Sequence, residues 1–240
     1  MAGHSHWAGI KHKKGRQDKL RSKIFSKISR EITVAAKIGS KDPSTNHRLR
    51  AAIESAKEAN MPKDNISRAI NKSDLSKNEN FENLRYEGFG PKNIALIIET
   101  LTNNKNRTAG TIRAILQKFG GNLGTTGSTV HYFDNLGIIQ FDINGIPEEK
   151  ALDFATTTGA VDCFSYKNFH EITCKKADFY KIKNEAEKLL KKIVYSGIEW
   201  RPKICNSLNK EDSLKIKNLL EILDEDDDIQ SVFHNCKFYK

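Results

Sequence analysis

Apolar residues recur at steps of three and four along the first part of the chain, which is the spacing of one helix face. The longest stripe consists of Leu20, Ile24, Ile28, Ile32 and Ala35. It predicts a helix over 16–38, and shorter stripes predict a second helix over 46–60 and a third from Pro62, since proline is favoured in a first helical turn. The connections between these segments are short. The pattern therefore predicts a small three-helix bundle over residues 1–72.

A polar stretch over 73–83 predicts a linker, and beyond it short apolar runs typical of strands alternate with helical stripes. The predicted order inside 136–203 is strand 137–143, helix 147–157, strand 161–166, strand 169–174, helix 177–191 and strand 197–200. Such a βαββαβ unit closes on itself. Residues 136–203 are therefore predicted to form a domain of their own.

The segments on either side of this unit remain to be placed. They are strand 93–101, helix 106–119 and strand 129–133 before it, and helix 210–223 and strand 229–235 after it. Joined, they make most of a second α+β sandwich over 84–135 plus 204–240, interrupted by the first. The expected fold class is α+β, with an N-terminal three-helix bundle followed by two α+β domains, one inserted into the other.

Charge is distributed unevenly along the chain. Residues 1–72 carry 17 Lys and Arg against 6 Asp and Glu, whereas residues 73–240 carry 23 against 24. Compositional drift toward lysine would have spread over all 240 residues. A surplus confined to one segment indicates an anionic partner, and nucleic acid is the expected one.

The predicted first helix carries a basic row with the same three- and four-residue spacing. An ordinary solvated helix face is the alternative explanation for such a row. The preceding arm interleaves Trp7 and several imidazoles with cations and with the flexible Gly9, a composition that suits base stacking and phosphate binding. The candidate nucleic-acid-binding residues are His4, His6, Trp7, Lys11, His12, Lys13, Lys14, Arg16, Lys19, Lys23, Lys27, Arg30, Arg48, Arg50 and Arg107.

Three features of the sequence resemble catalytic or metal sites. The glycine-rich tract 120–127 lacks the spacing of a phosphate loop and precedes a strand, so it predicts a turn. Cys174 and His170 lie four apart on one predicted strand with no third group, which favours a buried thiol. The acidic run 224–228 could hold Mg²⁺, form a solvated turn, or counter the basic segment in cis. We expect no enzyme, no metal site and no cofactor.

Cysteine usage and hydropathy bear on the compartment. No apolar run approaches the length of a membrane span, and the start of the chain lacks a secretory apolar segment. The cysteines, which form no C-x-x-C pair, predict free core thiols in a reducing compartment. They are Cys163, Cys174, Cys205 and Cys236.

Several blocks along the whole chain resemble the YebC/PmpR family, which includes the mitochondrial translational activator of cytochrome oxidase. Early blocks are Gly3-His4-Ser5, Trp7, Ile10-Lys11-His12, Lys23-Ile24-Phe25-Ser26-Lys27, Arg30-Glu31-Ile32-Thr33-Val34-Ala35-Ala36, Arg48-Leu49-Arg50-Ala51-Ala52 and Asn60-Met61-Pro62-Lys63-Asp64. Later blocks are Tyr86-Glu87-Gly88-Phe89-Gly90-Pro91, Asn104-Lys105-Asn106-Arg107-Thr108, Gly120-Gly121-Asn122-Leu123-Gly124 and Asp226-Asp227-Asp228-Ile229-Gln230-Ser231-Val232-Phe233-His234-Asn235. His6 and Gly9 depart from the usual Lys and Asn, and 161–217 matches only loosely.

The resemblance implies a helical domain and two ferredoxin-like domains. It implies two functions, a DNA-binding transcriptional regulator or a ribosome-associated factor that relieves stalled synthesis. The aromatic, basic arm suits irregular RNA better than a DNA groove, which favours the ribosome and ribosomal RNA over promoter DNA. Because the family-like block begins at residue 2, we expect no transit peptide and a cytoplasmic location.

Overall fold

The computed structural model describes residues 14–74, 81–190 and 193–239, with side chains from Arg21 onward. The chain divides into two compact units. We call Phe133–Lys203 the inserted unit, and the chain up to Tyr132 together with the chain from Ile204 the flanking unit. One α+β unit thus interrupts another, as the predicted fold class requires. The helical bundle and the discontinuous sheet fall in the same unit, so the finer boundaries near 72 and 84 stay a prediction.

The helical part of the flanking unit contains α1 (Lys14–Ile38), α2 (His47–Glu58) and α3 (Lys63–Lys72), which match the predicted helices. Their inward faces share a core of Ile32, Ala35, Ala36, Leu49, Ala52, Ala56 and Ile66. Asn46 caps α2, and its amide also donates to the Ala35 carbonyl at 2.8 Å. This bond fixes the start of α2 against the end of α1.

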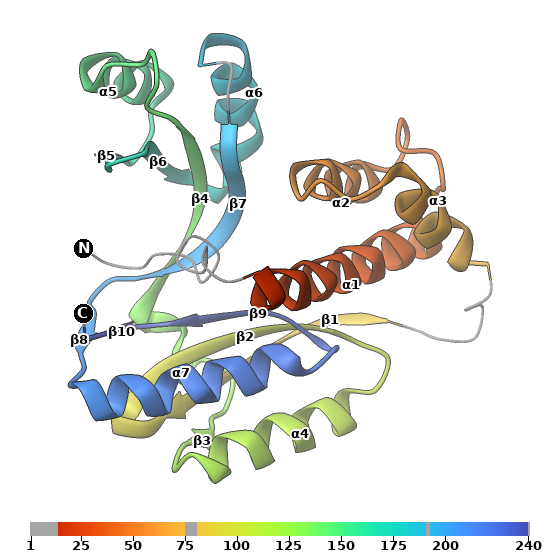
Figure 1. Cartoon of the computed structure of the whole chain (residues 1–240), viewed down its shortest axis with the longest axis vertical. Helices are drawn as coiled ribbons and strands as arrows, with labels where there is room; N and C mark the ends of the chain where they lie inside the picture. Colours follow the sequence, from red (N-terminus) through yellow and green to blue (C-terminus); the bar gives the residue numbers. More distant parts are fainter. Residues whose placement is uncertain (1–13, 75–80, 191–192, 240) are drawn as a thin grey trace. The chain divides into compact units, whose positions relative to one another are not determined.

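The sheet of the flanking unit consists of β1 (Glu82–Gly90), β2 (Ile94–Thr102), β3 (Asn122–Leu123) and β9 (Ile229–His234), and its helices are α4 (Lys105–Lys118) and α7 (Lys210–Glu225). The strands pair antiparallel in the order β3-β1-β2-β9. Helices α4 and α7 cover one face of this sheet, where Ile94, Leu96 and Ile98 of β2 are buried (Figure 1). A short parallel pair, β8 (Asn206–Ser207) and β10 (Cys236–Lys237), closes the unit.

The sheet differs from the prediction in two places: one strand was missed and one predicted strand was wrong. Strand β1 was not predicted, because its sequence is polar and glycine-rich; pairing with β2 along its whole length stabilises it. The strand predicted over 129–133 is instead a 3₁₀ turn, Val130–Tyr132, followed by the first residue of the next strand. The backbone N–H groups of Thr129 and Val130 donate to the Glu87 carboxylate at 2.7 and 2.9 Å rather than to a neighbouring strand.

The inserted unit contains β4 (Phe133–Asp142), α5 (Glu148–Thr158), β5 (Asp162–Ser165), β6 (Phe169–Lys175), α6 (Phe179–Leu189) and β7 (Ile193–Pro202). The strand order β5-β6-β4-β7 with βαββαβ connectivity is ferredoxin-like, in agreement with the predicted fold class. Gly137 lets β4 approach α6 closely, because a Cβ there would lie 2.6 Å from Cys174 Sγ and from the Phe179 ring.

The described cysteines are free thiols, as predicted, although only Cys174 and Cys236 are buried. Burial raises the pKa of Cys174 to about 11 and that of Cys236 to about 12, which keeps these thiols protonated and unreactive. Within the described residues, no helix combines the length and apolar character that crossing a membrane requires.

Candidate nucleic-acid interface

The described part of the basic row of α1, Lys23, Lys27 and Arg30, lies against the acidic run 224–228, which begins in the last turn of α7 and continues beyond it. Lys23 Nζ lies 3.0 Å from Asp224 Oδ2, and Lys27 pairs with the same carboxylate. Lys27 also donates to the Gln230 carbonyl at 3.3 Å. Three roles were possible for the acidic run: a Mg²⁺ site, a solvated turn, or a partner of the basic segment of the same chain. These contacts show the third role, because its carboxylates pair with cations of α1.

Asp228 is the centre of this contact, and its side chain is 7% exposed. One carboxylate oxygen accepts from Arg30 Nη2 at 2.6 Å, and the other accepts from Arg107 Nη2 at 2.7 Å. The hydroxyls of Thr102 and Thr108 donate to the second oxygen at 3.1 and 2.7 Å. Burial alone would raise the pKa of Asp228, but these hydrogen bonds and the charge of Arg30 outweigh it and hold the pKa below its ordinary value.

Arg48 and Arg50 of α2 are also engaged within the protein. Arg48 forms a bidentate pair with Glu31, with Nε and Nη2 at 2.6 and 3.1 Å from the carboxylate oxygens. Arg50 is exposed and donates to the carbonyls of Pro43 and Ser44. Arg50 forms no ion pair within the described residues, although its charge helps to lower the pKa of the nearby Asp42, whereas Arg48 is neutralised by Glu31.

The arm residues His4, His6, Trp7, Lys11, His12 and Lys13 lie outside the described residues. Lys14, Arg16 and Lys19 belong to α1, which the structure describes there by its backbone. The structure therefore brings together Lys23, Lys27, Arg30 and Arg107 around the acidic run, and leaves Arg48 and Arg50 apart on α2. The role of all of these residues in nucleic-acid binding stays a prediction.

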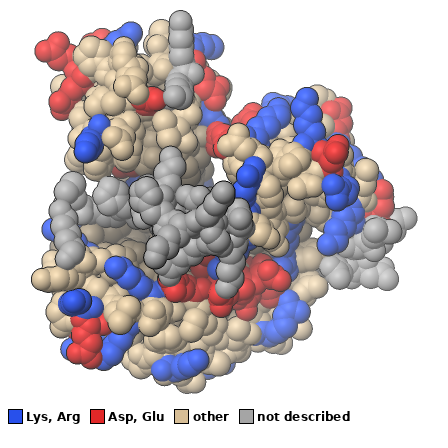
Figure 2. Space-filling model, viewed as in Figure 1, with Lys and Arg blue, Asp and Glu red and all other residues tan. Residues whose placement is uncertain are grey.

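Other cations of the helical part are exposed to solvent. Lys57 on α2 and Lys63 and Arg68 on α3 form no hydrogen bond or ion pair through their side chains within the described ranges. Figure 2 shows Lys and Arg side chains spread over the helical part, with acidic side chains gathered over α7. Sequence reasoning did not select Lys57, Lys63 or Arg68, because they follow no regular row; only the net charge of residues 1–72 pointed to them.

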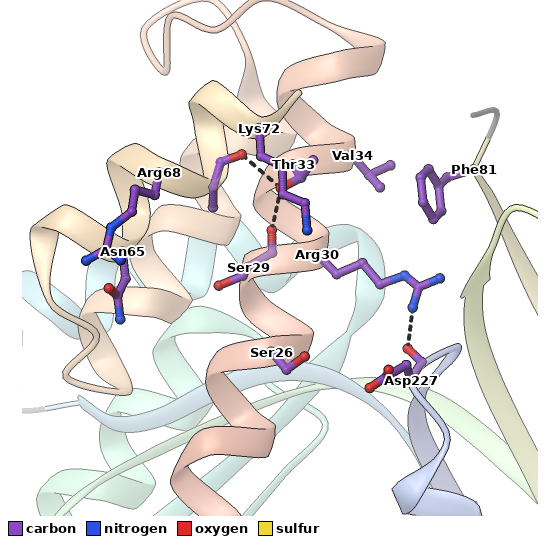
Figure 3. A pocket seen from close by; sticks show the side chains of 11 residues that line it. Ser26, Ser29, Arg30, Thr33, Val34, Asn65, Arg68, Lys72, Phe81 and Asp227 are labelled. Carbon is purple, nitrogen blue, oxygen red and sulfur yellow. Dashed lines mark hydrogen bonds between the residues drawn. The ribbon is translucent and has the colours of Figure 1, made fainter. Parts of the chain in front are cut away.

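A pocket of about 530 Å³ lies over α1, with α3 on one side and the Phe81 side chain on the other (Figure 3). Ser26 and Ser29 of α1 and Asn65 and Arg68 of α3 line it. Within the described residues, these four side chains form no hydrogen bond or ion pair. The pocket therefore presents unused hydroxyl, amide and guanidinium groups.

Arg30 forms the opposite wall of this pocket. Its Nη1 donates to the Asp227 carbonyl at 2.9 Å, and its guanidinium carbon lies 5.1 Å from the centre of the Phe81 ring. The ammonium of Lys37 lies 6.0 Å from the same ring centre. Cations thus already occupy the aromatic surface of Phe81.

The glycine-rich tract 120–127 is a turn whose donors are used internally. Gly127 N–H donates to Glu87 Oε1 at 3.0 Å, and Gly124 N–H donates to the Glu87 carbonyl at 2.8 Å. The Glu87 side chain is 1% exposed. A phosphate loop needs such N–H groups free to reach its ligand, and here the carboxylate and the backbone carbonyl of Glu87 accept them.

The other candidate sites are likewise occupied or incomplete. His170 is buried, with Nδ1 at 2.8 Å from Ser165 Oγ and Nε2 at 2.9 Å from the Ile146 carbonyl, so both ring nitrogens are engaged away from Cys174. Among the described residues, no group of three or more His, Cys, Asp or Glu side chains is placed to hold a metal ion.

Comparison with known proteins places this chain in a family. A sequence model described as the TACO1/YebC protein N-terminal domain matches residues 5–75, and one described as the TACO1/YebC second and third domain matches residues 81–236. The chain belongs to the TACO1/YebC family. The resemblance seen in the sequence is confirmed.

Relatives match over nearly the whole length. A probable transcriptional regulatory protein of Pelagibacter ubique is 52% identical over 238 residues, which cover 99% of each chain. One of Zymomonas mobilis is 46% identical over 235 residues, covering 98% of this chain and 94% of that protein. The crystal structure of a conserved hypothetical protein from Aquifex aeolicus superimposes with a TM-score of 0.83 at 39% identity, covering 98% of both chains.

Proposed function

We propose that the protein is a nucleic-acid-binding regulator of gene expression, that it acts without catalysis, and that its ligand is ribosomal RNA in the cytoplasm. The observation that carries this proposal is the exposed positive charge of the helical part. Lys57, Lys63 and Arg68 have no acidic partner within the described residues. Unneutralised cations release counterions when they meet phosphates, and this release drives binding to nucleic acid.

The preference for RNA rests on the arm that precedes α1. In the sequence, Trp7 stands among His4, His6 and His12 and close to several lysines. An aromatic ring can stack on an unpaired base, and irregular RNA offers such bases more often than duplex DNA does. This combination supports a ribosome-associated role, in which the protein relieves stalled synthesis.

A DNA-binding transcriptional regulator is the second candidate. The relatives from Pelagibacter ubique and Zymomonas mobilis are named probable transcriptional regulatory proteins. The same exposed cations would serve a DNA backbone equally well, because phosphate contacts carry no information about sequence.

The hydrogen-bond partners and the burial of the potentially reactive side chains support the absence of catalysis. Glu87 binds backbone N–H groups, His170 binds Ser165 and a carbonyl, and burial keeps Cys174 protonated. Each of these groups has a structural partner or environment that accounts for it.

Cross-linking in cells, followed by sequencing of the bound nucleic acid, tests the proposal. Enrichment of ribosomal RNA segments is the expected result. Enrichment of discrete promoter regions would favour the transcriptional regulator instead, and recovery of neither above the level of an unrelated basic protein would contradict both.

A further inference from the structure

The pocket over α1 has the composition of an anion site. Its free donors are the hydroxyls of Ser26 and Ser29, the amide of Asn65 and the guanidinium of Arg68. Lys72 of α3 and Arg30 of α1 also line the pocket, but Arg30 is already paired with Asp228. Asp227 is the acidic residue among the lining side chains.

The donors come from facing helices and converge on one space. Ser26 and Ser29 are three residues apart on α1, and Asn65 and Arg68 are three residues apart on α3, so each pair shares a helix face. Thr33 fixes the helices at this point, because its hydroxyl lies 2.9 Å from the Ser29 carbonyl and 2.8 Å from the Ala69 carbonyl. The backbones of the two helices that carry the donors are therefore held together at this point before any ligand arrives.

The pocket is large enough for a phosphate or a base, and its free donors favour a phosphate. A volume of about 530 Å³ falls within the range of small-ligand sites, roughly 300–1,000 Å³. The ring of Phe81, which could have stacked on a base, is already in contact with Arg30 and Lys37. What the pocket leaves free is hydrogen-bond donors and positive charge, which is what phosphate oxygens require.

We propose that the pocket between α1 and α3 binds a backbone phosphate of the nucleic acid, with Arg68 as its principal cation and Ser26, Ser29 and Asn65 as hydrogen-bond donors. This inference rests on the proposed function and names the site at which the nucleic acid is held. Arg30 also lines the site, but its terminal nitrogens already bind the Asp227 carbonyl and the Asp228 carboxylate, which neutralises its charge.

The first test compares Arg68→Gln with Arg113→Gln in the full chain. Both arginines are exposed on helices of the flanking unit and make no side-chain hydrogen bond or ion pair within the described residues, but only Arg68 lines the pocket. Affinity for a labelled single-stranded oligoribonucleotide is measured against salt. Loss of one phosphate contact on this single strand should flatten the slope of log affinity against log salt by about 0.7, which is about a fourfold loss near physiological salt. Arg113→Gln should leave both near the wild-type values.

A second pair of variants tests the pocket by adding charge. Asn65→Asp places a carboxylate in the pocket with almost no change of shape, and Asn71→Asp adds the same charge to α3 outside it. We expect Asn65→Asp to weaken binding at least as much as Arg68→Gln, and Asn71→Asp to weaken it clearly less. Circular dichroism checks that each variant stays folded.

The outcomes separate the site from the function. Strong wild-type binding with equal effects of Arg68→Gln and Arg113→Gln would overturn the pocket and leave the proposed function standing. Failure of the wild-type protein to bind either single-stranded RNA or duplex DNA would overturn the function and the inference with it. A third outcome is that Arg68→Gln still binds RNA but no longer binds a poly-glutamate probe that the wild-type protein does bind. This outcome would assign the pocket to an acidic protein partner instead.

Discussion

The two basic surfaces of the helical part are made of the same side chains and are used differently. On α1, the side chain of Lys27 is 12% exposed and that of Arg30 is 22% exposed, and both are held by the acidic run 224–228 at the end of α7. On α2 and α3, Lys57 and Arg68 are exposed and unpaired within the described residues. A row of cations at helical spacing thus marks an internal contact here, whereas scattered cations remain available to a ligand.

The difference arises from a partner that lies far away in the sequence. Asp224 is separated from Lys27 by 197 positions. A nucleic acid that bound Lys27 or Arg30 would have to displace a carboxylate that is already in place, which costs part of the binding free energy. No such cost applies to Lys57 or Arg68.

The largest effect is expected at the centre of the internal contact. Asp228→Ala leaves Arg30 and Arg107 without their carboxylate, and it should lower the free energy of unfolding of the flanking unit by about 3 kcal/mol. This value is the lower end of the range for a broken buried ion pair, because the Arg107 side chain is 52% exposed. Native-state hydrogen exchange measures this, with amides of β4 and β7 in the inserted unit as internal reference.

Asp227→Ala is the matched control for this variant. Asp227 is exposed and accepts from Arg30 through its backbone carbonyl, which alanine retains, so the change should stay within about 0.5 kcal/mol. Equal effects of the two variants would show that Asp228 is no more important to stability than its neighbour.

Next in size is the removal of one ammonium from the internal contact. Lys27→Gln loses a charged hydrogen bond to Asp224 and should destabilise the flanking unit by about 1.5–3 kcal/mol. Lys57→Gln, at an exposed position, should change stability by no more than about 0.5 kcal/mol. Urea unfolding distinguishes them, and a Lys57 effect as large as that of Lys27 would erase the difference between the two surfaces.

How far the sequence predicts this molecule depends on the range of the interactions involved. Helix α1 and the inserted unit follow from local periodicity, so they were predicted well. Strand β1 was missed because its polar, glycine-rich sequence is stabilised by β2 rather than by its own pattern. The acidic run was recognised as a possible partner in cis, but residue spacing cannot say that Asp224 meets Lys27, since only the folded chain brings them together.

The two surfaces should also differ in the salt dependence of RNA binding. Lys57→Gln with Lys63→Gln removes two unpaired charges and should flatten the slope by about 1.4–1.8, which is about a 15- to 30-fold loss near physiological salt. Lys23→Gln with Lys27→Gln should change the slope less, because Asp224 already neutralises those ammonium groups in the free protein. A larger effect from the α1 pair would mean that nucleic acid opens the internal contact.

The smallest effect is expected from acid. Burial would raise the pKa of Asp224, but the charge of Lys27 and the hydrogen bonds from Lys27 and Lys23 outweigh it and hold the pKa below its ordinary value. A carboxylate whose pKa is lowered by folding stabilises the protein above its unfolded pKa, near 3.9, and this stabilisation is lost as the pH falls through the folded value. Each unit by which folding lowers the pKa corresponds to about 1.4 kcal/mol.

The difference in unfolding free energy between wild type and Asp224→Asn should therefore be greatest above about pH 5 and shrink below about pH 4. Asp153→Asn, at an exposed position of α5 with no ion pair within the described residues, should leave the profile unchanged. A difference at Asp224 that stays constant through the acid range would show that its charge contributes nothing to the contact with α1.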